Sequence, residues 1–162
     1  MRLGTLVLAL AAIGTLAQPV QSVAVKTSDG NALVCRLVNR GTAVTLVFTH
    51  SMYGGEVRET WRADGNMLVR DRIVAERAAA AEYYATDGRT QRVDGGYEVI
   101  VAPLQASELP FRIDQIGNHR LRIDDEEIAL TSEVSGPTGA TLSASQAPLL
   151  ARIVDSDTDC GT

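Results

Sequence analysis

The segment AVTLVFTHSMYGGEVRETWR, residues 43–62, decides the predicted fold. Its first part, Ala43 to Ser51, is rich in Val, Thr and Phe, which is typical of a β-strand. Gly54-Gly55 follows and favours a two-residue turn, because both central residues of such a turn need positive φ. A second strand follows over residues 56–62. The segment therefore predicts an antiparallel hairpin.

The position of this turn sets the register of the predicted hairpin. The resulting cross-strand pairs are Tyr53 with Glu56, Ser51 with Arg58, His50 with Glu59 and Phe48 with Trp61. Because side chains alternate between the two faces of a strand, His50 and Glu59 share an otherwise apolar face. Opposed Cβ atoms lie about 4.5–5.5 Å apart. A buried carboxylate is costly unless it is paired, so the imidazole is the natural partner of Glu59.

Three interpretations of the His50–Glu59 pair stay open. The pair can simply fix the strand register, it can border a ligand or partner site, or it can support proton or metal chemistry. His119 lies on an apolar face of a later strand and could complete a metal set of two histidines and one carboxylate, although a hydrogen-bonded core histidine is the simpler interpretation. The candidates for ligand or partner binding are His50, Ser51, Tyr53, Arg58, Glu59 and Trp61.

We assign no catalytic residue, no metal ligand and no cofactor. Ser51 directly follows His50, so the two side chains point to opposite faces and do not form a nucleophile–base pair. The chain also lacks the Gly-x-Ser-x-Gly sequence of a nucleophile elbow. An enzyme that uses His50 and Glu59 in hydrolysis or metal chemistry remains the alternative to a binding module, as does a purely structural domain.

Around the hairpin, short apolar runs alternate with turn signals every 8–12 residues. The predicted strands cover residues 32–38, 67–74, 97–102, 111–116, 119–124 and 128–130, and Ala-rich residues 75–84 favour a short helical stretch. This spacing predicts an all-β fold, either a small antiparallel sandwich or a partly open barrel.

Both ends of the chain differ from this β region in composition. Arg2 precedes an apolar run, so residues 1–24 are typical of a secretory signal, with cleavage after Ala17 or Ala24, or of a retained anchor. We expect the β domain over residues 25–130. Ser, Thr, Gly and Pro dominate after residue 131, and aspartates follow, which predicts a mobile linker and acidic tail over residues 131–162.

The composition restricts the compartment and the partners. A net charge of −5 argues against nucleic acid and against electrostatic binding to anionic lipid. The predicted signal indicates an exported protein, periplasmic or otherwise extracytoplasmic, and we expect membrane contact only if the N-terminal segment stays uncleaved as an anchor. The two cysteines, Cys35 and Cys160, form a disulfide or stay apart, and we favour a buried Cys35 with a free Cys160.

At the hairpin residues the chain resembles an exported family catalogued as domain of unknown function 1850. The resemblance covers roughly residues 31–130 and rests on His50-Ser51 followed by Val57, Glu59 and Trp61. Further support comes from Gly96-Tyr97, Leu109-Pro110 and residues 116–123. Genes of this family often lie beside tripartite transporters of the TRAP and TAXI type. The resemblance therefore implies an accessory role, with a transporter permease or a solute-binding protein as the partner, and implies no reaction.

Overall fold

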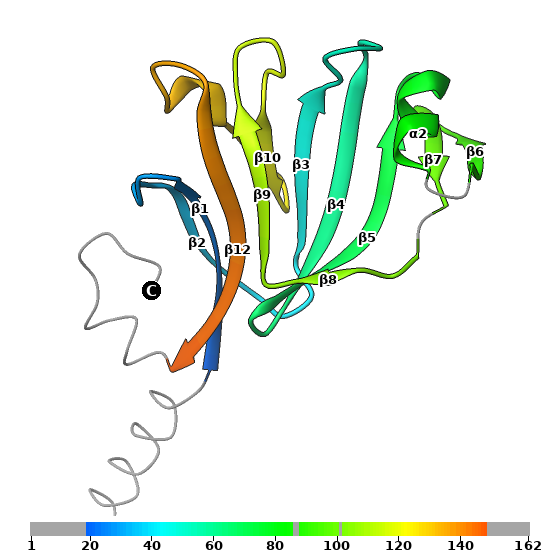
Figure 1. Ribbon diagram of the computed structural model, residues 1–162. Helices are drawn as coiled ribbons and strands as arrows, with labels where there is room; N and C mark the ends of the chain where they lie inside the picture. The colour runs from blue at the N-terminus through cyan, green and yellow to red at the C-terminus, as the bar shows by residue number, and fades with distance from the viewer. Residues whose placement is uncertain (1–18, 86–87, 101, 149–162) are drawn as a thin grey trace, which may run out of the picture.

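The computed structural model describes residues 19–148 except 86–87 and 101, and it consists of two antiparallel sheets that face each other (Figure 1). This confirms the predicted all-β class, and of the two predicted architectures the fold resembles the sandwich, since the sheets do not close into a barrel. Within the described ranges, no helix combines the length and the apolar character that a bilayer crossing requires.

The smaller sheet has four strands in the order β2-β1-β12-β9. Their bounds are β1 Pro19–Thr27, β2 Ala32–Val38, β9 Glu108–Ile113 and β12 Thr138–Pro148. The first and last described strands lie side by side, because Pro19 pairs with Pro148 and Thr27 with Ala140. This sheet therefore joins the two ends of the described chain.

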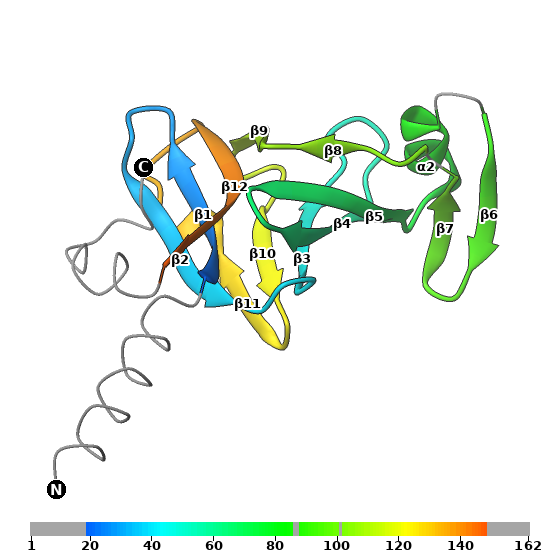
Figure 2. The ribbon, with the colours of Figure 1, turned by 90° about the horizontal axis from the view of Figure 1, so that it is seen from below.

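The larger sheet has eight strands, in the order β11-β10-β3-β4-β5-β7-β6 with β8 attached to β5. Their bounds are β3 Ala43–Thr49, β4 Glu56–Asp64, β5 Met67–Ala75, β6 Thr90–Val93, β7 Gly96–Val99, β8 Gln105–Ala106, β10 Arg120–Ile123 and β11 Glu126–Ala129. A 3-10 turn, η1 (Leu130–Ser132), follows β11. Seen from below, the small sheet lies at one end of the molecule and β6 and β7 at the other (Figure 2).

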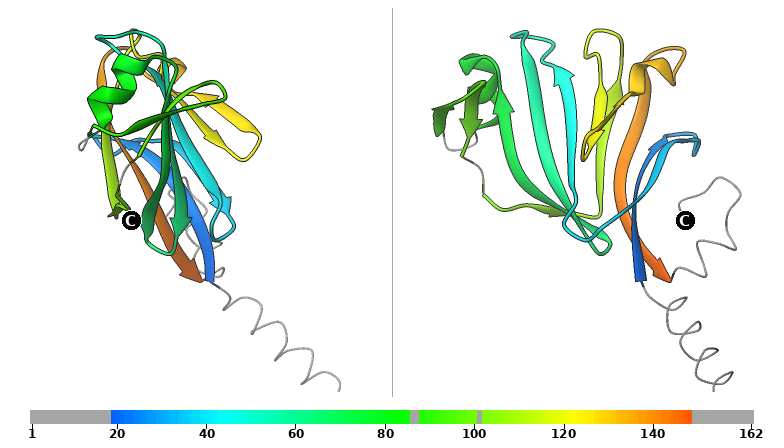
Figure 3. Two further views of the ribbon diagram at one scale, coloured as in Figure 1. Left: turned by 90° about the vertical axis from the view of Figure 1, so that its right-hand side faces the viewer. Right: turned by 180° about the vertical axis from the view of Figure 1, so that it is seen from behind.

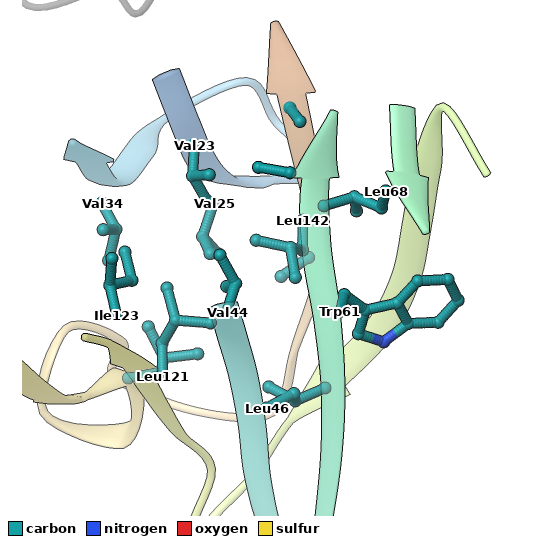
Figure 4. Close-up of a cluster of buried hydrophobic side chains, with 14 of the residues drawn as sticks. Val23, Val25, Val34, Val44, Leu46, Trp61, Leu68, Leu121, Ile123 and Leu142 are labelled. Atoms are coloured by element: carbon teal, nitrogen blue, oxygen red, sulfur yellow. The ribbon is translucent and has the colours of Figure 1, made fainter. Parts of the chain in front are cut away.

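The main core lies between the two sheets. Alternate residues of facing strands point inward, as the close-up in Figure 4 shows for Val23 and Val25 of β1 and Val44 and Leu46 of β3. Burial of each such side chain stabilises the fold by about 1.5–3 kcal/mol. Trp61 is fully buried in this cluster. The period-two pattern that predicted these strands is therefore the pattern that fills the sandwich.

A second, smaller core lies where helix α2 (Ala78–Tyr84) covers the large sheet. Ala80 and Ala81 of the helix are fully buried. They pack in one cluster with Val57, Ile73, Ala75 and Val99. The helix lies within the Ala-rich stretch that the sequence singled out, and it starts only after β5 has ended at Ala75.

The predicted domain limits of 25–130 are wrong at both ends. Residues 138–148, predicted as part of a mobile linker, form the central strand β12, whose Ala140, Leu142 and Ala144 are buried. Two of these three inward residues are alanines, so the strand's alternation is weak in sequence. At the other end β1 begins at Pro19, and its Val23 is fully buried. The predicted cleavage position after Ala17 and the acidic tail from residue 149 lie outside the described residues. Ala24, the other predicted cleavage position, lies within β1 and is buried.

The predicted hairpin is present, but its register is wrong. Thr49 pairs with Glu56, and the His50 N–H donates to the Gly55 carbonyl at 3.0 Å. The chain turns through residues 51–54 instead of through Gly54-Gly55 alone. As a result Glu59 lies opposite Leu46 and not opposite His50. The offset is an even number of residues, so every side chain keeps the face that the sequence predicted.

Cys35 also differs from the expectation. It is exposed on β2 and not buried, and it takes part in a disulfide bond. Position 160 lies outside the described residues.

Candidate functional site

His50 follows β3 and is almost fully buried, with 6% of its surface exposed. The backbone N–H groups of Met52 and Tyr53 both donate to its Nδ1 atom, each at 3.2 Å. Because Nδ1 accepts these two bonds, the proton of the neutral ring lies on Nε2. The turn that closes the hairpin thus fixes the tautomer of the imidazole.

His119 precedes β10 and is buried in a similar way, with 9% of its surface exposed. Its Nδ1 atom accepts a long hydrogen bond of 3.4 Å from the Asp114 N–H. The imidazole stacks on Phe48 with ring centroids 5.6 Å apart. Burial lowers the pKa of His119, and the Asp114 carboxylate opposes this shift in part. The neutral ring therefore also carries its proton on Nε2.

Three tyrosines surround His50. The ring centroids of Tyr53 and Tyr83 each lie 5.1 Å from that of His50, and the Tyr84 ring lies 5.8 Å away. Tyr53 comes from the hairpin turn, whereas Tyr83 and Tyr84 come from the last residues of α2. Helix α2 therefore supplies an aromatic wall to a histidine that belongs to a different part of the chain.

These groups line a cleft of about 260 Å³ between the β3–β4 turn, helix α2 and the loop that joins β9 to β10. This end of the molecule is uppermost in Figure 1. The lining residues are Phe48, Thr49, His50, Ser51, Met52, Tyr83, Tyr84, Arg112, Asp114, Gly117 and His119. We call this feature the His50–His119 cleft.

The loop between β9 and β10 shapes the His119 side of the cleft. Asp114 Oδ1 accepts a hydrogen bond of 2.6 Å from the Gly117 N–H, and the Asp114 carbonyl accepts one of 3.2 Å from Asn118. The Gly117 carbonyl in turn accepts the Thr49 N–H at 2.7 Å, which attaches the loop to β3. These bonds hold the two histidines in one site although 69 residues separate them.

Several polar groups of the cleft have no protein partner. Among the described residues, nothing bonds to the Nε2 atom of His50 or of His119, and no hydrogen bond or ion pair forms with the Arg112 guanidinium. Arg112 lies opposite Gly139 of β12, which has no side chain to offer it. The cleft therefore presents two neutral N–H donors and one cation to whatever enters it.

Glu59 lies deeper in the molecule, on the same face of the sheet. Gly55 pairs with His50, and Glu59 follows four residues later, which is about 13 Å along the strand. Burial raises the pKa of Glu59, and Arg70 opposes this shift in part. Tyr84 lies near both groups: its ring is close to His50, and burial together with the Glu59 charge raises its pKa to about 12. The predicted direct pair of His50 and Glu59 does not form.

The structure gathers some of the predicted site residues and disperses others. His50 and Ser51 line the cleft, and Tyr53 packs against His50. Arg58 faces the other side of the sheet, opposite Val47, and donates to the Gly95 carbonyl at 3.0 Å. Trp61 is enclosed in the main core and contributes no exposed surface.

Sequence reasoning missed seven residues that line the cleft: Thr49, Met52, Tyr83, Tyr84, Arg112, Asp114 and Gly117. Two local signals were available. Adjacent tyrosines at the end of an amphipathic helical stretch place large aromatic groups at a helix terminus, and an Asp three residues before a Gly is typical of a side-chain-capped turn. Neither signal shows that the two segments meet at His50.

The set of His50, Glu59 and His119 does not form a metal centre. Across the described part of the chain, no three His, Cys, Asp or Glu side chains lie close enough together to hold a metal ion. Ser51 lines the cleft but makes no hydrogen bond with His50 in the described structure. The arrangement is that of a recess with hydrogen-bond donors and aromatic walls.

A family model described as Domain of unknown function (DUF1850) matches residues 44–130. The chain belongs to this family. The matched range is more than half of the chain, runs from β3 to η1 and contains every residue that lines the His50–His119 cleft. This match confirms the resemblance that the hairpin residues indicated. No curated protein and no solved structure matches the chain.

Proposed function

We propose that this protein is an extracytoplasmic binding module that assists a tripartite solute-uptake transporter, and that the His50–His119 cleft receives its ligand. One observation carries the proposal. In two buried imidazoles Nδ1 accepts backbone N–H groups, whereas no described residue bonds to either Nε2 atom, and both rings line the same cleft. Neither Nε2 atom is sealed from solvent, so both donors remain accessible to a ligand in the cleft.

The walls of the cleft suit a small organic molecule. Binding sites for such molecules are concave and mostly apolar, with a few polar groups that orient the ligand. Here Phe48, Tyr83 and Tyr84 supply the apolar surface, and the imidazoles supply directed donors. The tyrosine rings also pack against one another, since Tyr83 and Tyr84 lie 5.4 Å apart. The recess is therefore formed before a ligand arrives.

The position of the cleft also supports an accessory role. Strand β1 starts at the end of the sandwich opposite the β3–β4 turn, as Figures 1 and 3 show. The apolar segment that precedes β1 in the sequence is the predicted export signal or anchor. A domain held at the membrane by that segment would present its cleft on the far side. Met52, Tyr83 and Ile116 are exposed there, with 70%, 63% and 74% of their surfaces accessible, and offer apolar contacts to a partner.

Uptake measurements in cells test this proposal. Deletion of the gene should reduce the uptake of the solute carried by the transporter encoded beside it, and the wild-type gene should restore uptake. The His50→Asn variant should restore much less, because Asn keeps an acceptor for the turn N–H groups and loses the Nε2–H donor. Arg92→Gln is the matched control, since Arg92 is exposed on β6 and does not line the cleft.

Two results would contradict the proposal. Unchanged uptake after deletion would remove the transporter role. Equal rescue by wild type and His50→Asn, at equal protein levels, would show that the cleft has no part in it and would leave a structural role for the histidine.

A further inference from the structure

The charges at the mouth of the cleft specify the ligand further, on the assumption that the proposed function is correct. Arg112 and Asp114 both line the cleft, near the end of β9. They are two residues apart, which corresponds to about 7 Å along an extended chain. The cleft therefore presents one cation and one anion beside each other.

These two side chains do not neutralise each other. No ion pair joins Arg112 to Asp114, and no other described carboxylate pairs with Arg112. Several other described arginines do form such pairs: Arg62 with Asp71 at 2.9 Å, Arg36 with Glu126 at 2.7 Å and Arg40 with Asp64 at 2.6 Å are examples. Because Arg112 and Asp114 do not pair with each other, both charges are available to a ligand.

Asp114 has one oxygen committed and one available. Oδ1 accepts the Gly117 N–H at 2.6 Å and so holds the loop in shape. No described residue bonds to Oδ2. A carboxylate oxygen in this position is an acceptor for a ligand ammonium group. The loop therefore holds the Asp114 carboxylate in place through Oδ1 and leaves Oδ2 available to a ligand.

The cleft also carries hydrogen-bond donors that suit a carboxylate. The Arg112 guanidinium can grip a carboxylate with two N–H groups, and the Nε2–H groups of His50 and His119 can donate to carboxylate oxygens. The rings of Phe48, Tyr83 and Tyr84 line the same cleft and can pack against a flat or branched apolar part of the ligand. The cleft thus combines a carboxylate site, an ammonium site and an aromatic wall.

From this arrangement we infer that the ligand of the His50–His119 cleft is a free α-amino acid with an apolar or aromatic side chain. Its carboxylate binds Arg112 and the imidazole Nε2–H groups, and its ammonium group binds Asp114 Oδ2. A simple organic acid would leave Asp114 facing its carboxylate, which is unfavourable at short range. A simple amine would leave Arg112 and both imidazole donors without acceptors.

Three ligands that share one phenyl ring and one two-carbon linker test the inference. L-phenylalanine carries both charges, 3-phenylpropanoate lacks the ammonium group, and 2-phenylethylamine lacks the carboxylate. We expect L-phenylalanine to bind at least tenfold more tightly than either analogue in calorimetric titrations of the purified protein. Imidazole resonances of His50 and His119 should shift in NMR spectra on its addition.

Two substitutions separate the charges. Arg112→Gln should weaken the binding of L-phenylalanine and of 3-phenylpropanoate, and should leave that of 2-phenylethylamine unchanged. Asp114→Asn keeps an oxygen acceptor for Gly117, and it should weaken the binding of L-phenylalanine and of the amine only. Arg92→Gln and Asp125→Asn are the matched controls, because both lie outside the cleft, and neither should change any affinity.

The outcomes distinguish this inference from the proposed function. If either analogue binds as tightly as L-phenylalanine, the cleft is a ligand site but the amino-acid inference is wrong. If L-phenylalanine binds equally to wild type and Arg112→Gln, the inference is again wrong. If L-phenylalanine and both analogues fail to bind or to shift the imidazole resonances, the amino-acid inference is wrong, and only the uptake experiment above then decides the proposed function.

Discussion

Gly117 lies so close to His119 that a β-carbon at Gly117 would sit 2.1 Å from Cε1 of the imidazole. No real pair of carbon atoms that are not bonded approaches so closely. Only a glycine therefore permits the imidazole to lie where it does, stacked on Phe48 and tilted against Phe111 with ring centroids 5.6 and 6.0 Å away. The backbone of one loop residue thus determines the position of a cleft residue.

Gly117→Ala should destabilise the protein by about 1–3 kcal/mol, as overpacking of a buried site does. The new methyl group must displace the His119 ring from between its aromatic neighbours. Urea denaturation measures the change. The double variant Gly117→Ala, His119→Ala should lose less than the sum of the two single variants, because the second change removes the clash. Gly136→Ala is the control, since nothing lies within 4 Å of a β-carbon there.

His119 should make stability depend on pH near neutrality. Burial lowers its pKa in the folded state below the ordinary value of 6.5. The unfolded chain therefore binds more protons just below pH 6.5, so this contribution to stability is present above that pH and is lost as pH falls toward the folded pKa. Urea denaturation of the wild type and of His119→Gln at pH 7.5 and pH 5.5 checks this. The wild type should lose more stability than the variant between the two pH values, and equal losses would contradict the assignment.

Glu59 should act with the opposite sign. Burial raises its folded pKa above the ordinary value of 4.5. Between these two values the folded protein binds more protons than the unfolded chain, so stability falls as pH rises through that window. Glu59→Gln, which stays neutral, should therefore gain stability relative to the wild type between pH 4 and pH 7.5. Glu82→Gln, a change at an exposed position of α2, is the control and should track the wild type.

Trp61 is the single tryptophan of the chain and is fully buried, so its fluorescence reports on the core. Iodide should quench it poorly in the folded protein and strongly in urea. Trp61→Ala should cost about 3–5 kcal/mol of stability, as large-to-small changes of buried aromatics do. Efficient quenching of the folded protein would contradict the burial of Trp61 and would make this residue a candidate for ligand or partner binding again.

The sequence predicted the strands well where both inward and outward residues have strong preferences. The predicted strand over residues 32–38 and the predicted start of the next strand at Ala43 match β2 and β3. It failed at β12, because alanines on the inner face and Ser, Thr and Gly between them resemble a linker. It failed at β1, because residues 19–24 follow an apolar run and were grouped with it.

The site was predicted only in part, and the reason lies in the hairpin turn. Gly54 and Gly55 both have positive φ, at 63° and 76°, as a two-residue turn requires. The turn nevertheless includes Ser51 to Gly54, because the backbone N–H groups of Met52 and Tyr53 bond to the His50 ring. A side-chain acceptor within the loop thus competes with the tighter turn, and strand propensities carry no information about it.

By itself, the sequence determined the family, the all-β class and the face of the sheet on which His50, Glu59 and Trp61 lie, because the alternation of side chains along a strand is a local property. Only the tertiary structure decided which of these residues meet. It buried Trp61, left Glu59 below the cleft, and brought Tyr84, Arg112 and His119 to His50 from three other segments. Contacts between distant segments depend on how the sheets and α2 pack, and no local pattern along one strand encodes that packing.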